Sequence, residues 1–394
     1  MCSVVDSAHS HSPIHESLEA SYMTKKIHGS ESFFLSTADV SVAVTQQGGH
    51  MAPVTFHTSE GDFSPYSSAP WEPKECDESL PHLLKELRGD FFCLPFGPQE
   101  NGLPHGDTAN SVWQQLYCSA NEISLVCHSQ CPEALVKKTI SLRTGHTALY
   151  ISHQIDGLHG DFSYGNHPIL DFSGLTIGEG RLAVSPFRWA SVYPGVFSNP
   201  DHGETGILQH NALFSSLCDV PTHAGGSIDL TKYPTQYGHE DLIMMVNEPA
   251  TSQQPFAWSA VTMKNMVWFS LKLVEDFPAT LFWISNGGRS AHPWESRHTC
   301  RLGIEEVCSY FCDSVDQSRL HLLSHLAIPT TRKFTSDKST DLRIIQGATP
   351  VPSQFGQVKQ IVPSAEGVLI TGENGHSIAV SLDLAFLLAN QKPQ

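Results

Sequence analysis

Alternating apolar and polar residues are the main pattern along this chain. Val40, Val42 and Val44 alternate with polar residues, the turn QQGG follows, and HMAPVTF begins a second run. A period of two is typical of strands that bury one face, so this stretch predicts a β-hairpin. Further strand-like runs follow, and they read SLVCHS, VKKTISLRT, TALYISHQI, FAWSAVTM, NMVWFSLKL and TLFWISN.

Tight turns join these predicted strands. Residues 143–146 and the pair Lys264 and Asn265 separate neighbouring runs, and Asn374 with Gly375 lies between two alternating runs near the C-terminus. Asn-Gly between alternating runs is the strongest short-range signal of a hairpin. The strands are too many and too evenly spaced for an alternation of strands and helices. The pattern therefore predicts an all-β fold, a large antiparallel β-supersandwich with a few short helices.

Only short segments have helical periodicity. Residues 79–88 form a short amphipathic run, and residues 302–315 and 381–391 are further helix candidates. Residues 1–30 are rich in Ser and His and aperiodic, which predicts a polar, loosely ordered N-terminal segment. No low-complexity linker divides the remaining sequence, so one β-sandwich domain is expected over residues 31–394.

Composition and charge narrow the function. Only 16% of residues are charged, while 29 Gly and 25 Pro supply many turns, a balance that suits sheets better than helical bundles. The formal net charge of −17 repels phosphates, so neither nucleic acid nor an anionic membrane is an expected partner. No apolar run reaches 18 residues, so no membrane span is predicted. The N-terminus does not resemble a secretory signal, which predicts a cytoplasmic protein.

Ten cysteines are scattered along the chain, and no CxxC pair occurs. In the cytoplasm they are expected to be reduced thiols. Cys127 with Cys131 and Cys308 with Cys312 lack the spacing of a zinc ribbon, so no metal ligands are assigned.

The first block with candidate chemistry covers residues 87–113. Arg88 precedes a very apolar stretch, His105 stands beside Gly106, and Trp113 follows. A planar guanidinium there can face a buried cleft, and the glycine lets a ligand approach the imidazole. The alternative is a turn histidine, with an arginine that pairs with a carboxylate such as Asp90.

Two further blocks place polar groups next to strand-like runs. Asn166, His167 and Pro168 interrupt two such runs, and proline restrains His167 to extended backbone, which can present its imidazole from a strand end. The alternative is an exposed histidine in a turn. Residues 239–241 read His-Glu-Asp, and Asp241 stands just before an apolar strand.

The last block contains two adjacent glutamates, Glu305 and Glu306, between Ile304 and Val307. In a strand or at a helix start, one carboxylate should point inward and the other outward. A buried carboxylate has a raised pKa and can act as a general base. The alternative is a pair of glutamates at the start of a helix.

In this order, the blocks resemble the aldose 1-epimerase (galactose mutarotase) superfamily. The resemblance covers roughly residues 35–385, and the matching positions are Arg88 to Asp90, Pro95 to Pro98, His105 with Gly106 and Trp113, Asn166 to Pro168, Asp241, and Leu302 to Glu305. Ile169 and Leu170 replace an aromatic pair of the family, and the segment around Arg289 and Trp294 is not part of its pattern. These departures indicate a separate bacterial branch.

The resemblance implies a reaction and a site. Ring opening of a sugar hemiacetal needs a base at the anomeric hydroxyl and an acid at the ring oxygen, a task that suits a carboxylate and an imidazole. By resemblance Glu305 is the base, His167 the acid, and His105 a hydrogen-bonding group near the ring oxygen. The predicted contacts to a carbohydrate substrate are Arg88, Asp241, Trp113, Asn166 and Arg289, with Trp283 and Trp294 as alternative stacking partners.

This chemistry requires no metal and no organic cofactor, and the sequence does not indicate an oligomeric state. Two other functions stay open. One is a non-catalytic carbohydrate-binding protein of the same fold. The other is a metal-dependent carbohydrate-active enzyme that uses His153 and His159, or His292 and His298, as ligands.

Overall fold

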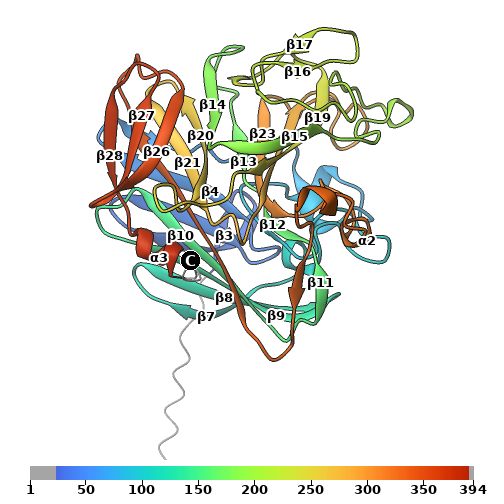
Figure 1. The fold of residues 1–394 in the computed structure, drawn as a ribbon. Helices are drawn as coiled ribbons and strands as arrows, with labels where there is room; N and C mark the ends of the chain where they lie inside the picture. Colours follow the sequence, from blue (N-terminus) through green and yellow to red (C-terminus); the bar gives the residue numbers. More distant parts are fainter. Residues whose placement is uncertain (1–23, 390–394) are drawn as a thin grey trace, which may run out of the picture.

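The computed structural model of the chain describes residues 24–389. In this part the chain forms 28 β-strands and three short α-helices, which confirms the predicted all-β fold (Figure 1). Most of the predicted N-terminal segment, residues 1–23, lies outside the described residues. Its last part is ordered, because β1 (Lys25–Ile27) pairs with β2 (Ser30–Ser36).

The largest sheet has nine antiparallel strands. In spatial order they are β18 (Lys232–Tyr233), β14 (Gly180–Val184), β20 (Ala257–Met263), β21 (Met266–Lys272), β25 (Thr340–Pro350), β10 (Ala148–Asp156), β9 (Glu133–Leu142), β8 (Glu122–Gln130) and β7 (Gln114–Cys118). The predicted runs from SLVCHS to NMVWFSLKL lie in this sheet. Lys264, between β20 and β21, has a positive φ of 54°, which fits its predicted place in a tight turn.

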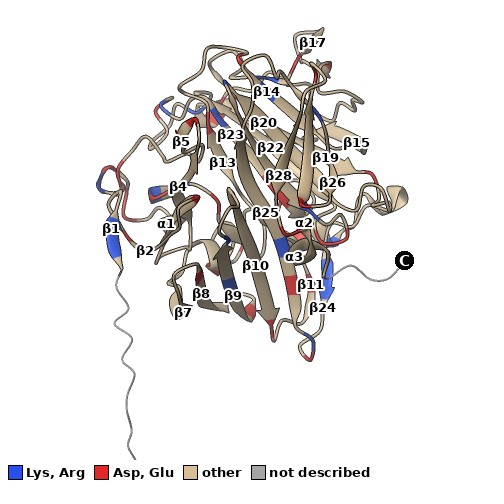
Figure 2. Cartoon of the chain, turned by 90° about the vertical axis from the view of Figure 1, so that its left-hand side faces the viewer, with Lys and Arg blue, Asp and Glu red and all other residues tan. Residues whose placement is uncertain are grey.

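A second sheet of seven strands carries the candidate chemistry. In spatial order its strands are β15 (Phe187–Val192), β19 (His239–Asn247), β22 (Ala279–Asn286), β23 (Arg301–Cys308), β12 (Tyr164–Asn166) and β6 (Phe92–Cys93), and β13 (Ile169–Asp171) also pairs with β23. Every residue of β19 and β22 is buried, so both faces of this sheet are covered. Figure 2 shows β22, a central strand of this sheet, without charged residues.

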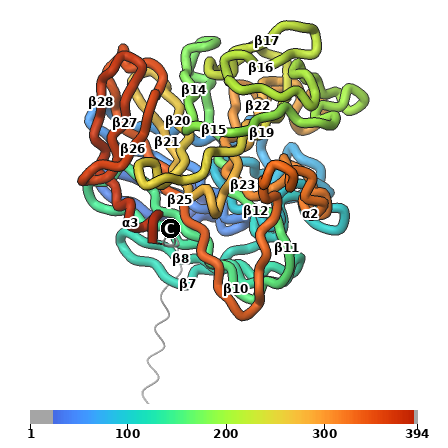
Figure 3. The backbone as a smooth tube through the Cα atoms, in the orientation of Figure 1, coloured from blue at the N-terminus to red at the C-terminus, as the bar shows by residue number. Residues whose placement is uncertain are grey.

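Smaller sheets complete the fold. The five-stranded sheet contains β1 and β2 with β3 (Val40–Thr45), β4 (Met51–Thr58) and β5 (Gly61–Phe63), and thus the predicted N-terminal hairpin. Two-stranded sheets pair β11 (Gly160–Phe162) with β24 (Arg332–Phe334) and β16 (Val220–Pro221) with β17 (Ser227–Ile228). Strands β16 and β17 lie in the long segment that connects β15 to β19 (Figure 3). The C-terminal sheet consists of β26 (Val358–Ser364), β27 (Gly367–Gly372) and β28 (Ser377–Ser381), with the predicted Asn374 and Gly375 turn between the last two strands.

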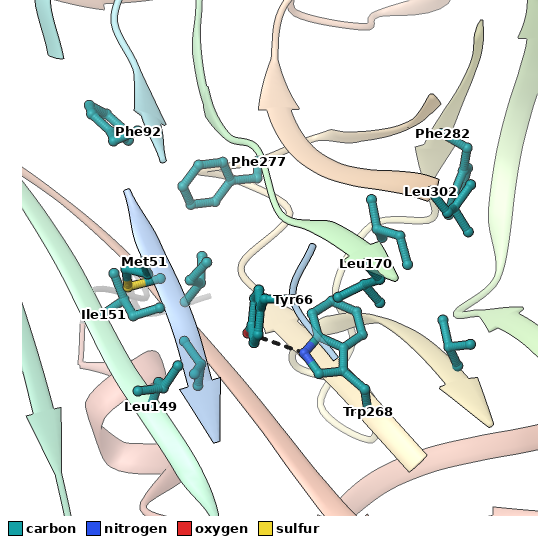
Figure 4. Close-up of a cluster of buried hydrophobic side chains, with 14 of the residues drawn as sticks. Met51, Tyr66, Phe92, Leu149, Ile151, Leu170, Trp268, Phe277, Phe282 and Leu302 are labelled. Atoms are coloured by element: carbon teal, nitrogen blue, oxygen red, sulfur yellow. Dashed lines mark hydrogen bonds between the residues drawn. The ribbon is translucent and has the colours of Figure 1, made fainter. Parts of the chain in front are cut away.

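The three large sheets meet in one hydrophobic core. Trp268 of the nine-stranded sheet, Phe282 of the seven-stranded sheet and Met51 of the five-stranded sheet are all buried there (Figure 4). Burying one such side chain contributes about 1.5–3 kcal/mol. The indole N–H of Trp268 donates to the hydroxyl of Tyr66 at 3.2 Å, so these two buried polar groups partner each other.

Two further cores cover the outer faces of the large sheets. One packs the C-terminal sheet, through Ile361 and Ile370, and α3 (Leu384–Leu388) against the nine-stranded sheet. The other covers the outer face of the seven-stranded sheet, where Leu242 and Leu281 pack against Leu83 and Leu87. Leu83 belongs to α1 (His82–Lys85). The second core forms the surroundings of the candidate site.

The helix predictions have mixed outcomes. Helices α1 and α3 confirm the helical runs at 79–88 and 381–391, although each helix is much shorter than its run. The helix predicted over 302–315 is wrong, because residues 301–308 form β23 and only α2 (Val315–Arg319) begins where that segment ends. Seven of the eight residues of β23 are buried, and hydrogen bonds to β22 on one side and to β12 and β13 on the other hold the strand extended.

Candidate active site

A cavity of about 190 Å³ lies on the outer face of the seven-stranded sheet. Strand alternation explains which residues reach it, since Leu242, Trp283 and Glu305 face the cavity while their neighbours face the main core. The rest of the lining comes from loops and from the segment around α1. The lining residues are Leu83, Leu84, Leu87, Phe91, Pro98, Pro104, His105, His167, Phe197, Leu242, Trp283, Arg289, Trp294, Glu305 and Cys312.

Strand register brings Glu305 and His167 together. In the antiparallel pair of β12 and β23, Asn166 stands opposite Glu306, so both share the face of the main core. The next residue, His167, therefore turns to the face of Glu305. Its Nε2 atom lies 3.3 Å from Oε1 of Glu305. Gly303 leaves room for this arrangement, because a Cβ atom there would lie 2.6 Å from that carboxylate oxygen.

The backbone and the neighbours of His167 fix its ring. The backbone N–H of His167 donates to Oδ1 of Asp90 at 2.9 Å and to the carbonyl oxygen of Phe91 at 3.0 Å. The imidazole stacks on the ring of Phe91 at 4.6 Å between centroids, and the ring of His105 meets it edge-on at 5.1 Å. In the described structure, Nδ1 of His167 and Oε2 of Glu305 have no protein hydrogen-bond partner. Both residues line the cavity, and the protein leaves the hydrogen-bonding capacity of these two atoms unused.

His105 lies in a tight turn and contacts a thiol. Its φ is +61°, and its Nδ1 accepts a hydrogen bond from the Gly97 N–H at 3.4 Å. Its Nε2 lies 4.0 Å from Sγ of Cys312. The adjacent Gly106 serves backbone packing, because a Cβ atom there would lie 1.9 Å from the Leu94 carbonyl oxygen. This steric need explains the His-Gly pair without reference to a ligand.

Burial shifts the proton affinities of these groups. It raises the pKa of Glu305 well above its ordinary value. Burial also lowers the pKa of His105 to about 4 and the pKa of His167 well below its ordinary value, and the neighbouring His105 lowers the latter further. A low-dielectric cavity disfavours charge on each group. Burial therefore favours the neutral form of the pair, with the proton on the carboxyl group of Glu305.

A second polar group, centred on Arg289, lies at the cavity wall. Its Nε is 3.1 Å from Oε1 of Glu204 and 4.0 Å from Oε2 of Glu240, and its guanidinium lies 4.7 Å from the centre of the Trp294 ring. Glu240 also accepts hydrogen bonds from Nε1 of Trp283 at 2.8 Å and from the Ser285 hydroxyl at 2.6 Å. Burial raises the pKa of Glu240 to about 7, although Arg289 acts against this shift.

Of the sequence-predicted site residues, His105, His167, Glu305 and Arg289 line the cavity and four others do not. Trp113 is fully buried, and its Nε1 donates to the Thr108 carbonyl. Asp241 accepts hydrogen bonds from the backbone N–H groups of Ile207 and Leu208 and contacts His239 at 2.6 Å.

Arg88 and Asn166 also lie outside the lining. Arg88 contacts the carbonyls of His28 and Glu86 and lines a different cavity, of about 400 Å³. It does not make the suggested pair with Asp90, whose carboxylate accepts from His167 and Gln346. Asn166 faces the main core, as its register dictates.

The sequence did not single out Glu240 and Cys312. Glu240 is not part of the lining but partners two residues of it, Trp283 and Arg289, and a strand that turns Leu242 toward one face also turns Glu240 that way. That alternation was the available signal. Cys312 had no such signal, because it follows the end of β23 in an irregular segment. Glu305 and Glu306 point to opposite faces of β23, as predicted, but the expectation that one of them faces outward is wrong, since both are buried.

The histidines named as alternative metal ligands do not belong to a cluster of described residues that could bind a metal ion. In residues 24–389, no group of three or more His, Cys, Asp and Glu side chains could hold a metal ion. His153 stacks on Phe92 at 4.0 Å, and His298 stacks on Trp283 at 5.4 Å. Over the same residues, no helix is long and apolar enough to cross a membrane.

Solved structures share the architecture of this chain. A protein from Escherichia coli K12, described as a candidate aldose 1-epimerase, superposes with a TM-score of 0.54 at 12% identity, over 81% of this chain and 99% of that one. A candidate aldose 1-epimerase from Klebsiella pneumoniae gives 0.55 at 12% identity, over 83% and 81%. The fold is galactose mutarotase-like. The aldose epimerase homologue from C. elegans has the same fold, with a TM-score of 0.51 at 13% identity over 82% and 100%.

The mutarotase-like fold is thus shared over 81–83% of this chain, despite the low identity. No family model and no curated protein sequence matches the chain. The likeness therefore concerns the fold, and the chemistry has to be argued from the cavity.

Proposed function

We propose that the protein is an aldose 1-epimerase-like isomerase that opens and recloses the ring of a sugar or sugar derivative by acid–base catalysis. One observation carries the proposal: a carboxyl group and an imidazole lie 3.3 Å apart in a cavity, each with an atom that has no protein partner. Paired titratable groups with shifted proton affinities in a cavity are typical of catalytic sites. The mutarotase-like fold supports the same reaction class by analogy.

The reaction moves two protons. Glu305 takes the proton of the anomeric hydroxyl, and His167 gives a proton to the ring oxygen as the bond between C1 and that oxygen breaks. The open aldehyde rotates about its C1–C2 bond, and the ring oxygen attacks the other face of C1. As the ring closes, Glu305 gives its proton to the carbonyl oxygen and His167 takes back the proton of the attacking hydroxyl, so the pair ends each turnover in its starting state.

The shared proton reconciles this assignment with the pKa directions. A carboxylic acid beside a neutral imidazole contains the same number of protons as a carboxylate beside an imidazolium. Transfer across the 3.3 Å contact converts the first pair into the second, which is the form that the reaction uses. A hydrogen-bonding ligand stabilises the charged form, because polar contacts replace the solvation lost on burial. His105 stands edge-on to His167 and would share the charge near the ring oxygen.

Exchange NMR and polarimetry on a panel of aldoses and sugar acids test the proposal. The wild-type protein should accelerate anomer interconversion of at least one sugar. Glu305→Gln should lower that rate by about 10²–10⁴-fold while the protein stays folded, because the amide cannot take a proton. Glu133→Gln, which changes an exposed carboxylate on β9, is the matched control and should keep full activity.

Two outcomes would count against the proposal. Full activity of Glu305→Gln would show that this carboxyl group is not the base. Sugar binding by the wild type without acceleration of any anomer exchange would instead favour a non-catalytic carbohydrate-binding protein.

A further inference from the structure

The cavity wall contains far more hydrocarbon than hydrogen-bonding groups. Ten of its fifteen lining residues are Leu, Pro, Phe or Trp. Leu83, Leu84 and Leu87, from the segment around α1, supply an apolar wall. The cavity volume of about 190 Å³ equals the liquid volume of about six water molecules. A space of this size suits a single monosaccharide.

Most polar groups of the lining already have a protein partner or a role in the proposed reaction. Under the proposed function, Glu305 and His167 serve the anomeric centre and the ring oxygen, and Nε2 of His105 faces the thiol of Cys312. The indole N–H of Trp283 donates to Glu240, so it is not free for a ligand. A hydroxyl far from the anomeric centre therefore finds few side-chain partners, and an unpaired buried hydroxyl weakens binding.

The charge of the wall disfavours an anionic sugar. Arg289 is the only Lys or Arg of the lining, and its Nε lies within 4.0 Å of carboxylate oxygens of both Glu204 and Glu240. Glu204, at 3.1 Å, offsets its charge, and Glu240 and Glu305 add two further acidic groups in or beside the cavity. A carboxylate or phosphate on the substrate would meet no unpaired cation in the lining.

The place of the ring oxygen indicates which hydroxyl is missing. The carbon that bears C6 in a pyranose is bonded to the ring oxygen, so its substituent lies near the acid His167. The ring of His167 packs against Phe91 at 4.6 Å and against Trp283 at 5.9 Å between centroids. A methyl group fits these surroundings, whereas a hydroxymethyl group would bury an unpaired hydroxyl.

We propose that the substrate of this site is an uncharged 6-deoxyhexose, whose methyl group packs against the apolar wall. This inference rests on the proposed function, because it uses the roles of Glu305 and His167 to orient the sugar. It extends that function from sugars in general to one chemical class.

Matched sugar pairs test the inference by exchange NMR. The pairs are 6-deoxy-D-galactose with D-galactose and 6-deoxy-D-glucose with D-glucose, with D-galacturonate as the anionic member. In at least one pair the deoxy sugar should have a kcat/KM about tenfold or more above its parent, since a site without a hydroxyl partner discriminates by about this factor. D-galacturonate should be the poorest substrate. Equal or higher kcat/KM for the parents, or for the acid, would overturn the inference.

A variant pair ties the preference to the wall. Leu84 is only partly buried, so Leu84→Gln should fold and should lower the ratio of deoxy to parent kcat/KM several-fold by supplying a hydrogen-bonding group. Leu80→Gln, a similarly exposed leucine outside the cavity, should leave the ratio unchanged. An unchanged ratio in Leu84→Gln would show that the leucine wall does not cause the preference for the deoxy sugar.

A binding measurement separates this inference from the proposed function. If no sugar shows accelerated exchange, the proposed function fails, and calorimetric titration with the same pairs still tests the wall. Tighter binding of the deoxy sugars would then support the apolar preference in a non-catalytic protein. Equal or weaker binding would overturn the preference as well.

Discussion

The two faces of β23 treat adjacent glutamates in opposite ways. Glu306, on the face of the main core, lies 2.5 Å from Nζ of Lys272 and accepts hydrogen bonds from Thr280 and Ser259. Glu305, on the face of the cavity, has His167 at 3.3 Å and one oxygen without a protein partner. Both side chains are buried to nearly the same degree.

The difference separates structural burial from functional burial. A buried carboxylate that is fully paired fixes the packing of the strands around it. A buried carboxyl group with an oxygen that has no partner costs stability, which is consistent with the proposed contact between Glu305 and a ligand. Burial alone therefore does not distinguish Glu305 from Glu306, whereas the number of their protein partners does.

The largest expected effect is the loss of the structural pair. Glu306→Gln should lower the free energy of unfolding by about 3–5 kcal/mol, because it leaves the buried ammonium of Lys272 without a countercharge. Glu305→Gln should leave it nearly unchanged or raise it, because it removes an unpaired acid. Urea denaturation of both variants measures the contrast.

A double variant controls for this effect. Lys272→Met combined with Glu306→Leu should recover most of the loss, because an apolar pair of similar volume replaces the ion pair. Equal losses in Glu305→Gln and Glu306→Gln would contradict the proposed difference between the two faces.

A smaller effect concerns pH and Glu240, the other acid that adjoins the cavity. Burial raises the pKa of Glu240 from 4.5 to about 7, so the folded state holds this proton while the unfolded state has lost it. This contribution is therefore absent well below pH 4.5 and destabilises the folded protein increasingly as the pH rises to about 7. Between pH 5 and pH 8 the loss should be about 2–3 kcal/mol.

Glu240→Gln isolates this contribution, because other titrating groups are common to both proteins. From pH 5 to pH 8, the midpoint of urea unfolding should fall less in the variant than in the wild type. The same pH dependence in both proteins would show that Glu240 ionises normally in the folded state.

The smallest effect compares neighbouring residues of one strand. Gly303→Ala places a Cβ atom against the Glu305 carboxylate. The carboxylate must then move, which should lower kcat/KM by about tenfold or more. Ile304→Val, on the other face, should cost about 0.5–1.5 kcal/mol of stability without a kinetic change. Steady-state kinetics and thermal unfolding of both variants decide the matter, and a kinetic defect in Ile304→Val would erase the distinction between the faces.

Local alternation was sufficient to predict most of the sheets, because a period of two records which face of a strand is buried. It failed at residues 302–308, where both faces are buried and the apolar residues no longer alternate with exposed ones. An apolar run with two glutamates fits a helix as well as a strand, and only pairing with β12, β13 and β22 decides between them.

The candidate site was predicted in part. His105, His167, Glu305 and Arg289 line one cavity, as the family resemblance had suggested for a shared site. Trp113 lies in the core and not at the cavity. The sequence could not show this, because a core tryptophan and a ligand-binding tryptophan give the same local pattern. The partners of an acid, which distinguish Glu305 from Glu306, come from strands distant in the sequence and have no local signal.

The chemistry and the wall of the cavity come from different parts of the architecture. Glu305 is held in the middle of a sheet, whereas Leu83 and Leu84 belong to the short helix α1 outside it and Leu87 follows that helix. Under the proposed function, exchange of that short segment should alter the shape of the cavity and leave Glu305 and His167 in place. Small libraries of variants in this segment should then be sufficient to select new sugar preferences without disturbing the acid–base pair.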